Sequence, residues 1–339
     1  MEENNEQKSE AHQPHIEPKK EEHKIEHQKK EEPKKSLKHS LMEFYDKKYK
    51  LLLIIPFIIL LLSLAQIGYQ IYSTGDFLNR DISLKGGVTV TIPYDKPFDI
   101  NNLEKQVKAN FPRNDVVVRT LRASGTVVGV IVEADIDGNN KAQVEHFLDS
   151  IGNSLQADLS KLDYGIEIIG SSLGASFFRE SLIALAVAFL FMGLVIFLYF
   201  RTFVPSAAVI LAAFSDMVFA LAVVNIMGMR VGTAGIAAFL MLIGYSVDTD
   251  ILLTVRVLKR KEGTVMDRIY SSIKTGMTET MTGMVAIVVA MMVTQSEVIR
   301  QIMIILFWGL IADIFNTWIQ NVGLLRLYVE KKAKKGVII

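Results

Sequence analysis

The chain has 339 residues, with 37 basic and 36 acidic side chains and a formal net charge of +1. Half of the residues are hydrophobic and the mean hydropathy is +0.30, higher than is typical of soluble globular chains. There is no cysteine, which excludes a disulfide framework, thiolate metal sites and thiol chemistry. The apolar residues must therefore be concentrated in particular segments.

The N-terminal segment is dominated by charge. Residues 1–50 carry 12 basic and 12 acidic side chains and few apolar ones before Leu41. Because such a segment buries too little surface to offset its ordering entropy, residues 1–40 are predicted to be a disordered cytoplasmic tail. Residues 41–50 turn amphipathic and predict an interfacial helix. The scattered histidines of this region favour a solvated tether over a loose metal site; they are His12, His15, His23, His27 and His39.

Six apolar stretches follow, each close to the roughly 20 residues that cross a hydrocarbon core. The predicted membrane helices are 51–72, 180–200, 206–227, 232–255, 275–295 and 302–325. Lys and Arg are concentrated before the first helix, in the loop 256–274 and in the tail 326–339, whereas two short loops on the other side carry only Arg230 and Arg300. This bias predicts a multi-pass cell-membrane protein with both termini cytoplasmic.

The segment 75–177 then lies on the extracytoplasmic side. Its strand-like runs are 84–92, 116–121, 126–132 and 166–169, and its helical runs are 99–111 and 139–159. The resulting order, β-α-β-β-α-β, is typical of the ferredoxin-like arrangement. The predicted fold class is an α-helical polytopic membrane protein of six transmembrane helices, with an α+β ferredoxin-like extracytoplasmic domain between helices one and two.

Five carboxylates fall within the predicted membrane helices. A charge at this depth is costly, so these residues are candidates for a proton or ion pathway. The alternative interpretation is that they are paired, neutral or snorkelling carboxylates that fix helix packing, which suits an acid near the interface best. The five are Asp216, Asp248, Asp250, Glu279 and Asp313, of which Glu279 is nearest an interface.

Asp248 and Asp250 cannot share one face of a regular helix, because residues two apart are separated by about 200°. Asp250 lies in a polar row with Ser246 and Thr254. Either the helix is locally broken, or one aspartate faces this bundle and the other faces a partner.

The last predicted helix carries a second polar stripe after Asp313, formed by Asn316 or Thr317, then Gln320, with Asn321 one position further on. With the polar row of the fourth helix, this stripe predicts a hydrated interior in which a buried carboxyl exchanges protons. No basic residue lies deep in the membrane, which favours protonatable sites over permanent ion pairs.

Motifs of soluble enzymes are missing from the sequence, including a Walker loop, Gly-x-Ser-x-Gly and His-Glu-x-x-His. We therefore expect no enzymatic activity, no cofactor and no metal site. Any energy input must come from a gradient or a partner.

Four motifs occur in order along residues 41–335. They are Asp81 followed by Gly86 and Gly87, the run 244–256, the run 274–278 and the run 312–321. Together they resemble the SecF family of protein-export membrane proteins in its archaeal form. Bacterial members of that family carry Asn-Asp at the positions of Asp248 and Thr249 and an arginine where we align Ser271, so the acids are shifted in this chain.

The resemblance implies membership of the resistance-nodulation-division superfamily and a partner, SecD, whose six helices complete a twelve-helix pseudo-symmetric unit. It implies an accessory role in Sec protein export, linked to the proton gradient in bacterial relatives. The expected partners are SecD, the Sec translocation channel, exported polypeptides and membrane lipid, with no nucleic acid. The alternative is a passive scaffold without ion coupling. A stand-alone small-molecule exporter is disfavoured, because six helices are half of a superfamily transporter. The choice between proton and sodium stays open, as do the exported substrates, the stoichiometry and the role of the tail.

Overall fold

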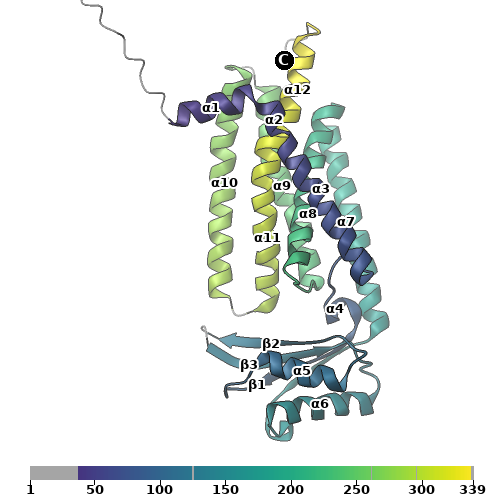
Figure 1. Ribbon diagram of the computed structural model, residues 1–339. Coiled ribbons are helices and arrows are strands. Elements are labelled where there is room, and N and C mark those ends of the chain that lie inside the picture. Colours follow the sequence, from purple (N-terminus) through teal and green to yellow (C-terminus); the bar gives the residue numbers. More distant parts are fainter. Residues whose placement is uncertain (1–36, 124–125, 261, 295, 337–339) are drawn as a thin grey trace, which may run out of the picture. The chain divides into compact units, whose positions relative to one another are not determined.

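The computed structural model describes residues 37–123, 126–260, 262–294 and 296–336 (Figure 1). The chain divides into two compact units, Met1–Met42 and Glu43–Ile339. Most of the predicted tail, with His12, His15, His23 and His27, lies outside the described residues. Helix α1 spans Leu37–Lys47, so it begins before residue 41 and includes the last residues that were predicted to be disordered. The apolar spacing of four between Leu37 and Leu41 extends the helical pattern in that direction.

Six helices of the described chain are long and apolar enough to cross a membrane. Their spans are Tyr49–Thr74, Ser171–Phe200, Phe203–Ile226, Thr233–Lys259, Val265–Val293 and Glu297–Ala333. The first comprises α2 (Tyr49–Leu52) and α3 (Ile54–Thr74), and the next four are α7, α8, α9 and α10 in chain order. The last comprises α11 (Glu297–Phe315), a π-helix (Asn316–Asn321) and α12 (Val322–Ala333).

Helix α7 begins at Ser171 rather than at the predicted residue 180. The predicted helix began with Glu180; in the structure Arg179 and Glu180 are both exposed on the surface of one continuous helix. The apolar pattern therefore located residues 180–200 of α7, and the helix continues toward the N-terminus as far as Ser171.

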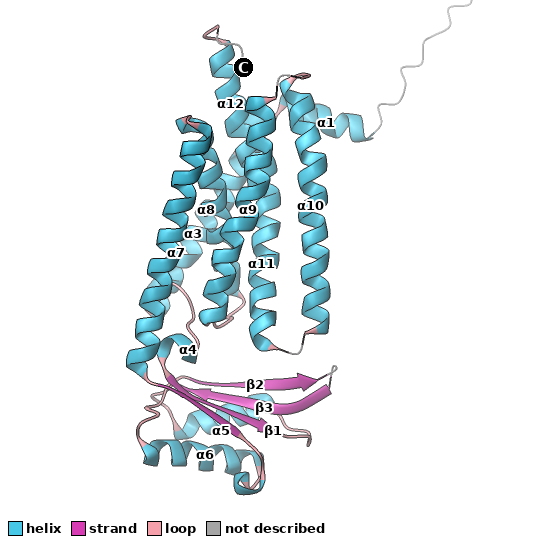
Figure 2. Cartoon of the chain, turned by 180° about the vertical axis from the view of Figure 1, so that it is seen from behind, coloured by secondary structure: helices cyan, strands magenta, loops and turns pink. Residues whose placement is uncertain are grey.

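Between α3 and α7 the chain forms a small sheet with two helices on one face (Figure 2). Its strands are β1 (Gly87–Pro93), β2 (Val116–Ala123), β3 (Thr126–Ala134) and β4 (Gly165–Ile169). They are arranged in the order β2-β3-β1-β4, and every neighbouring pair is antiparallel. The helices are α5 (Ile100–Asn110) and α6 (Lys141–Leu155), and a short 3₁₀ turn, Leu159–Lys161, follows α6. We call this part, residues 87–169, the sheet domain.

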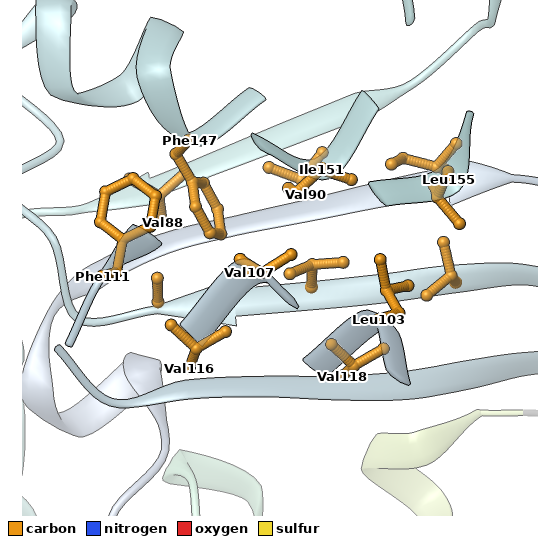
Figure 3. Packing of buried hydrophobic residues seen from close by; sticks show 14 of the residues in the cluster. Val88, Val90, Leu103, Val107, Phe111, Val116, Val118, Phe147, Ile151 and Leu155 are labelled. Atoms are coloured by element: carbon orange, nitrogen blue, oxygen red, sulfur yellow. The ribbon is translucent and has the colours of Figure 1, made fainter. Parts of the chain in front are cut away.

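The core of the sheet domain lies between the sheet and its two helices (Figure 3). Val88, Val90 and Ile92 alternate along β1 and are fully buried against Phe147 and Ile151 of α6. The residues between them point to the opposite face of the sheet, as strand geometry requires. We call this second face, on the side away from α5 and α6, the open face (Figure 2).

Strand β1 begins at Gly87, not at the predicted residue 84, because Ile82–Lys85 forms a helical turn, α4. Asp81 begins this turn and accepts a hydrogen bond from the backbone N–H of Ser83 at 2.9 Å. Such a side-chain cap is typical of a helix start. The sequence pattern missed α4 because a single turn carries too few residues to show a helical period.

The glycine pair at the entrance to β1 has a steric explanation. Gly86 has φ +84°, and a Cβ atom there would lie 2.4 Å from Cα of Ser171. Gly87 has φ +146°, and its Cβ would lie 2.4 Å from the carbonyl oxygen of Ala134. The chain that enters the sheet domain and the chain that leaves it therefore touch here, and only glycine fits both the space and the backbone.

Helices α8 and α9 form the interior of the membrane part. In each of them 56% of the most apolar window is buried, against 6% in α7 and 17% in α10. Small residues permit the close approach: a Cβ on Gly309 of α11 would lie 2.3 Å from Leu242 of α9. Any polar side chain on the facing sides of these helices is consequently shielded from lipid.

Candidate functional site

Three of the five membrane carboxylates lie in this interior. Asp216 of α8, Asp250 of α9 and Asp313 of α11 are each fully buried. Asp248 and Glu279 are exposed on the outer surfaces of α9 and α10. The predicted separation of Asp248 and Asp250 onto opposite faces is confirmed, and α9 stays a regular helix through both of them. We call Asp216, Asp250 and Asp313 the acid cluster.

Asp216 is bound by side chains from two other helices. Ser246 Oγ of α9 donates a hydrogen bond to Asp216 Oδ2 at 2.5 Å. Asn316 Nδ2 of the π-helix donates to Oδ1 at 2.7 Å. Both oxygens of this carboxyl therefore accept hydrogen bonds from neutral donors, Ser246 and Asn316.

Asp313 is bound by two hydroxyl groups. Thr317 Oγ1 donates to Asp313 Oδ1 at 2.7 Å, one turn further along the same helix. Thr249 Oγ1 of α9 donates to Oδ2 at 3.4 Å. The sequence pattern named Thr317 only as an alternative to Asn316 in the polar stripe, and it did not indicate Thr249. Thr317 follows Asp313 by four residues, which places the two side chains on one face of the helix.

Asp250 is the least satisfied member of the acid cluster. Asn321 Nδ2 donates to its Oδ1 at 2.7 Å, while Oδ2 is buried without a hydrogen-bond partner among the described residues. Thr254 Oγ1, one turn along α9, is also buried and without a partner in that part of the chain. None of the ion pairs formed by the described residues involves the acid cluster.

The π-helix supplies the amide partners of the acid cluster and one of its hydroxyl partners, Thr317. The N–H of Val322 points to the carbonyl of Thr317, five residues back instead of four. The wider turn places its polar side chains together in the interior, all of them at most 4% exposed: Asn316, Thr317, Gln320 and Asn321. Gln320 Nε2 reaches Ser215 Oγ of α8 at 3.5 Å. π-Helical turns are rare and are frequent at functional sites, and the hydrophobic period did not reveal this one.

At one end of α9 the chain contacts the segment that leads into the sheet domain. Arg80 and Val231 form an isolated parallel bridge, in which Asp81 N–H donates to Val231 O at 3.1 Å. A Cβ on Gly232 would lie 2.1 Å from Asp81 Oδ2. The predicted signature residue Asp81 therefore both caps α4 and packs against the loop that begins α9.

An ion cluster joins the sheet domain to the same loop. Asp115, just before β2, accepts hydrogen bonds from Arg230 Nη2 at 2.6 Å and from Lys85 Nζ at 3.1 Å. Burial raises the pKa of Asp115, but the two cations outweigh it, and the pKa is lowered overall. The carboxylate therefore stays charged, and its contact with Arg230 is kept, throughout the neutral range.

Replacing Asp115 with asparagine is expected to loosen this contact by about 1 kcal/mol or less, because both partners are partly solvated. A lowered pKa stabilises the fold above the ordinary carboxyl pKa of about 4, and this contribution is lost as the pH falls through the lower folded value. The acid limb of a thermal-unfolding profile should therefore flatten below about pH 4 in Asp115→Asn. Asp95→Asn, at an exposed position, is the control. An unchanged acid limb in Asp115→Asn would contradict the prediction.

Among the described residues, no group of three or more His, Asp and Glu side chains is placed to hold a metal ion. The acid cluster is spread along three helices, with each carboxyl held by its own hydroxyl or amide donors. The hydrogen-bond donors of these carboxyls are neutral, so none of them holds a carboxyl in its charged form as a cation would. The arrangement is therefore suited to taking up and releasing protons.

Comparison with known proteins supplies the family. The family described as "Protein export membrane protein SecD/SecF, C-terminal" matches residues 150–331. The chain is 37% identical over 299 residues to the protein-export membrane protein SecF of Methanocaldococcus jannaschii, a match that covers 85% of this chain and 99% of that relative. It is 35% identical to SecF of Pyrococcus furiosus, over 88% of this chain and 97% of that relative.

A solved structure shows the same fold. The crystal structure of SecDF from Thermus thermophilus, described as a translocon-associated membrane protein, superposes with a TM-score of 0.62 at 16% identity. The match covers 86% of this chain and 42% of that one, so this chain spans less than half the length of SecDF. With the six spans and the motif matches, these findings place the chain in the SecF family of multi-pass protein-export membrane proteins.

Proposed function

We propose that this chain acts with SecD in the cell membrane as an accessory subunit of the Sec machinery, and that protons passing through the acid cluster drive its outside part. One observation carries the proposal: three fully buried carboxyls are held only by neutral donors, and one oxygen of Asp250 has no partner among the described residues. A permanently charged, unpaired carboxylate is costly in this setting, whereas a protonated one is not.

The hydrogen-bond chemistry permits reversible protonation. A hydroxyl group rotates and both donates and accepts, so Thr249 and Thr317 can keep their bonds to Asp313 in either protonation state. An amide nitrogen only donates, so protonation of the bonded oxygen of Asp250 would break its bond from Asn321. Uptake of a proton at Asp250 Oδ2 leaves that bond in place.

Helix α9 offers a mechanical connection from these carboxyls to the sheet domain. It carries Ser246, Thr249 and Asp250 in its interior part, and its N-terminal end packs against Asp81. The preceding loop holds Asp115 of the sheet domain through Arg230. A shift of α9 on protonation would therefore reach the sheet domain through two separate contacts.

We also propose that the sheet domain is a ferredoxin-like extracytoplasmic domain and that both termini are cytoplasmic. The order β2-β3-β1-β4 with two helices on one face supports the first point. The sheet domain contacts the loop of Arg230, one of the two loops poor in basic residues, whereas the lysine-rich loop 256–274 follows the far end of α9. That charge distribution supports the orientation.

SecD is the proposed partner for an uncovered polar surface of α9 and α10. A groove of about 670 Å³ runs along α10, and its lining residues are Ser271, Lys274, Thr275, Thr278, Glu279, Thr282 and Gly283. The hydroxyls of Thr275, Thr278 and Thr282 donate to carbonyls of their own helix. Glu279 and the exposed Asp248 remain as charges that lipid does not solvate, so we infer that SecD helices cover them.

Exported polypeptides are the proposed ligands of the open face of the sheet. This face forms one wall of a cavity of about 690 Å³, whose other wall comes from the ends of α9 and α11. Thr89, Thr91 and Arg119 line the sheet side, and Arg300 and Gln301 line the opposite side. The lining also includes the acidic residues Glu133, Glu167 and Glu297. Walls that carry both basic and acidic side chains suit an extended polypeptide of varied sequence.

The experiment compares Asp250→Asn with Asp248→Asn, two changes of the same chemistry on opposite faces of α9. Export is measured in membrane vesicles with and without a proton gradient. Asp250→Asn is expected to lose the stimulation by the gradient, because asparagine does not take up a proton, while Asp248→Asn keeps it. Co-purification with SecD at normal yield is the check that each variant assembles.

The passive-scaffold function makes the opposite prediction. In that case the buried carboxyls are permanently neutral and serve only to join helices through hydrogen bonds. The two hydrogen bonds that Asp216 accepts from Ser246 and Asn316 are equally compatible with this role. Gradient-dependent export that survives in Asp250→Asn would exclude proton passage at this residue and favour the scaffold.

A further inference from the structure

The π-helix leaves one backbone carbonyl without its usual donor. In a regular α-helix the carbonyl of Trp318 accepts the N–H of Val322, four residues further on. Here that N–H points to the carbonyls of Ile319 and Thr317 instead. A buried carbonyl without a donor is costly, so another group must supply the bond if the π-helix is to persist.

That group is the phenol of Tyr45, which donates its hydroxyl hydrogen bond to the carbonyl of Trp318. Tyr45 lies on the interfacial helix α1, 273 residues earlier in the chain. Burial raises the pKa of Tyr45, so the phenol remains protonated and able to donate. The sequence assigned no role to this residue beyond the amphipathic pattern of residues 41–50.

Two further contacts hold the segment around Tyr45 along the last membrane helix. Asp46 Oδ1 accepts a hydrogen bond from Arg326 Nη2 at 2.7 Å, and the Arg326 guanidinium lies 4.0 Å from the ring centre of Tyr49. At Gly323 a Cβ atom would lie 2.6 Å from Leu53 Cδ1, so the two segments approach closely there. The position of Tyr45 is therefore set by contacts other than its own hydrogen bond.

We propose that Tyr45 is a positioning residue for the acid cluster. Its bond stabilises the π form of residues 316–321, and the π form holds Asn316, Thr317 and Asn321 on the three buried carboxyls. Without the hydroxyl, the N–H of Val322 can return to the carbonyl of Trp318, which narrows the turn and moves Asn321 relative to Asp250. The consequence for export rests on the proposed proton role of these carboxyls; the structural link does not.

The test uses Tyr45→Phe, which removes one hydroxyl, in the full chain assembled with SecD in lipid nanodiscs. Tyr49→Phe is the matched control, because it removes a hydroxyl from the same patch without touching the carbonyl of Trp318. Hydrogen exchange of the amides of residues 318–323 should be about tenfold faster in Tyr45→Phe and unchanged in the control. The infrared band of the Asp250 carboxyl, assigned through its loss in Asp250→Asn, should shift in Tyr45→Phe only.

Asp46→Asn weakens the attachment of α1 to Arg326 and leaves the phenol of Tyr45 in place. It therefore distinguishes a positioning role of the Tyr45 hydroxyl from a general effect of loosening α1. The inference is overturned if Tyr45→Phe leaves both exchange and the infrared band unchanged, or if Asp46→Asn alters them equally. Export is measured in the same samples, and Tyr45→Phe should lose at least half of the stimulation by the gradient. If Asp250→Asn retains that stimulation, the proposed function fails, while exchange and infrared data still decide the role of Tyr45.

Discussion

Replacement of Asp313 with asparagine is expected to reduce gradient-dependent export at least about tenfold, the scale typical of removing a group that transfers a proton. Asparagine has nearly the same shape as aspartate, and its carbonyl oxygen still accepts from Thr317 or Thr249. The helices should therefore pack normally, and only proton uptake is lost. Export in vesicles with and without a gradient measures the effect, and co-purification with SecD verifies assembly.

Two comparisons make the Asp313 result specific. Glu279→Gln removes a carboxyl at the exposed surface of α10 and is expected to leave the gradient response intact. If Asp250 and Asp313 act as one unit, the double variant should be no worse than either single variant, since residues of one pathway are strongly non-additive. Independent, multiplicative losses would instead mean that the two carboxyls serve separate steps.

Replacement of Gly86 with alanine is expected to destabilise the sheet domain by about 3 kcal/mol or more. The new Cβ would lie 2.4 Å from Cα and 2.6 Å from N of Ser171, which are backbone atoms that cannot turn aside, and φ is +84°. Gly165→Ala is the matched control, because no atom lies within 4 Å of its added Cβ and φ is not in the left-handed region. Gly86 directly precedes β1, and Gly165 is the first residue of β4.

Limited proteolysis is the suitable measurement for the Gly86 variant. Both tryptophans, Trp308 and Trp318, lie in the last membrane span, so their fluorescence does not report on the sheet domain. Cleavage within residues 87–169 should be much faster in Gly86→Ala than in Gly165→Ala. Equal resistance of the two variants would show that the close contact between Gly86 and Ser171 relaxes at little cost in free energy.

Much of the membrane architecture could be predicted from the sequence, because the bilayer imposes a simple rule. Apolar stretches of nearly 20 residues located all six spans, and helix geometry separated Asp248 from Asp250. Boundaries were less accurate. The length of an apolar stretch does not show where its helix begins, so α7 was predicted from residue 180 although it begins at Ser171.

The candidate site was predictable in part. The low tolerance of hydrocarbon for charge singled out Asp216, Asp250 and Asp313, which lie buried in the interior, together with Asp248 and Glu279, which do not. The sequence of α9 alone cannot decide this, because α9 carries an aspartate on its buried side, Asp250, and another on its exposed side, Asp248. The bonds of Tyr45 to Trp318 and of Asp115 to Arg230 join residues far apart in the chain, and no local pattern encodes them.

The close approach of the segments that enter and leave the sheet domain has a consequence for removing this domain from the chain. Gly87, the first residue of β1, pairs with Ile169, the last residue of β4, in the antiparallel ladder. The two ends of the sheet domain are thus separated by only about one inter-strand spacing, roughly 5 Å. The sheet domain could therefore be removed and the two chain ends joined by a short linker without stretching α4 or α7. The membrane helices could then be studied without the sheet domain, and foreign domains with adjacent termini could be grafted in its place.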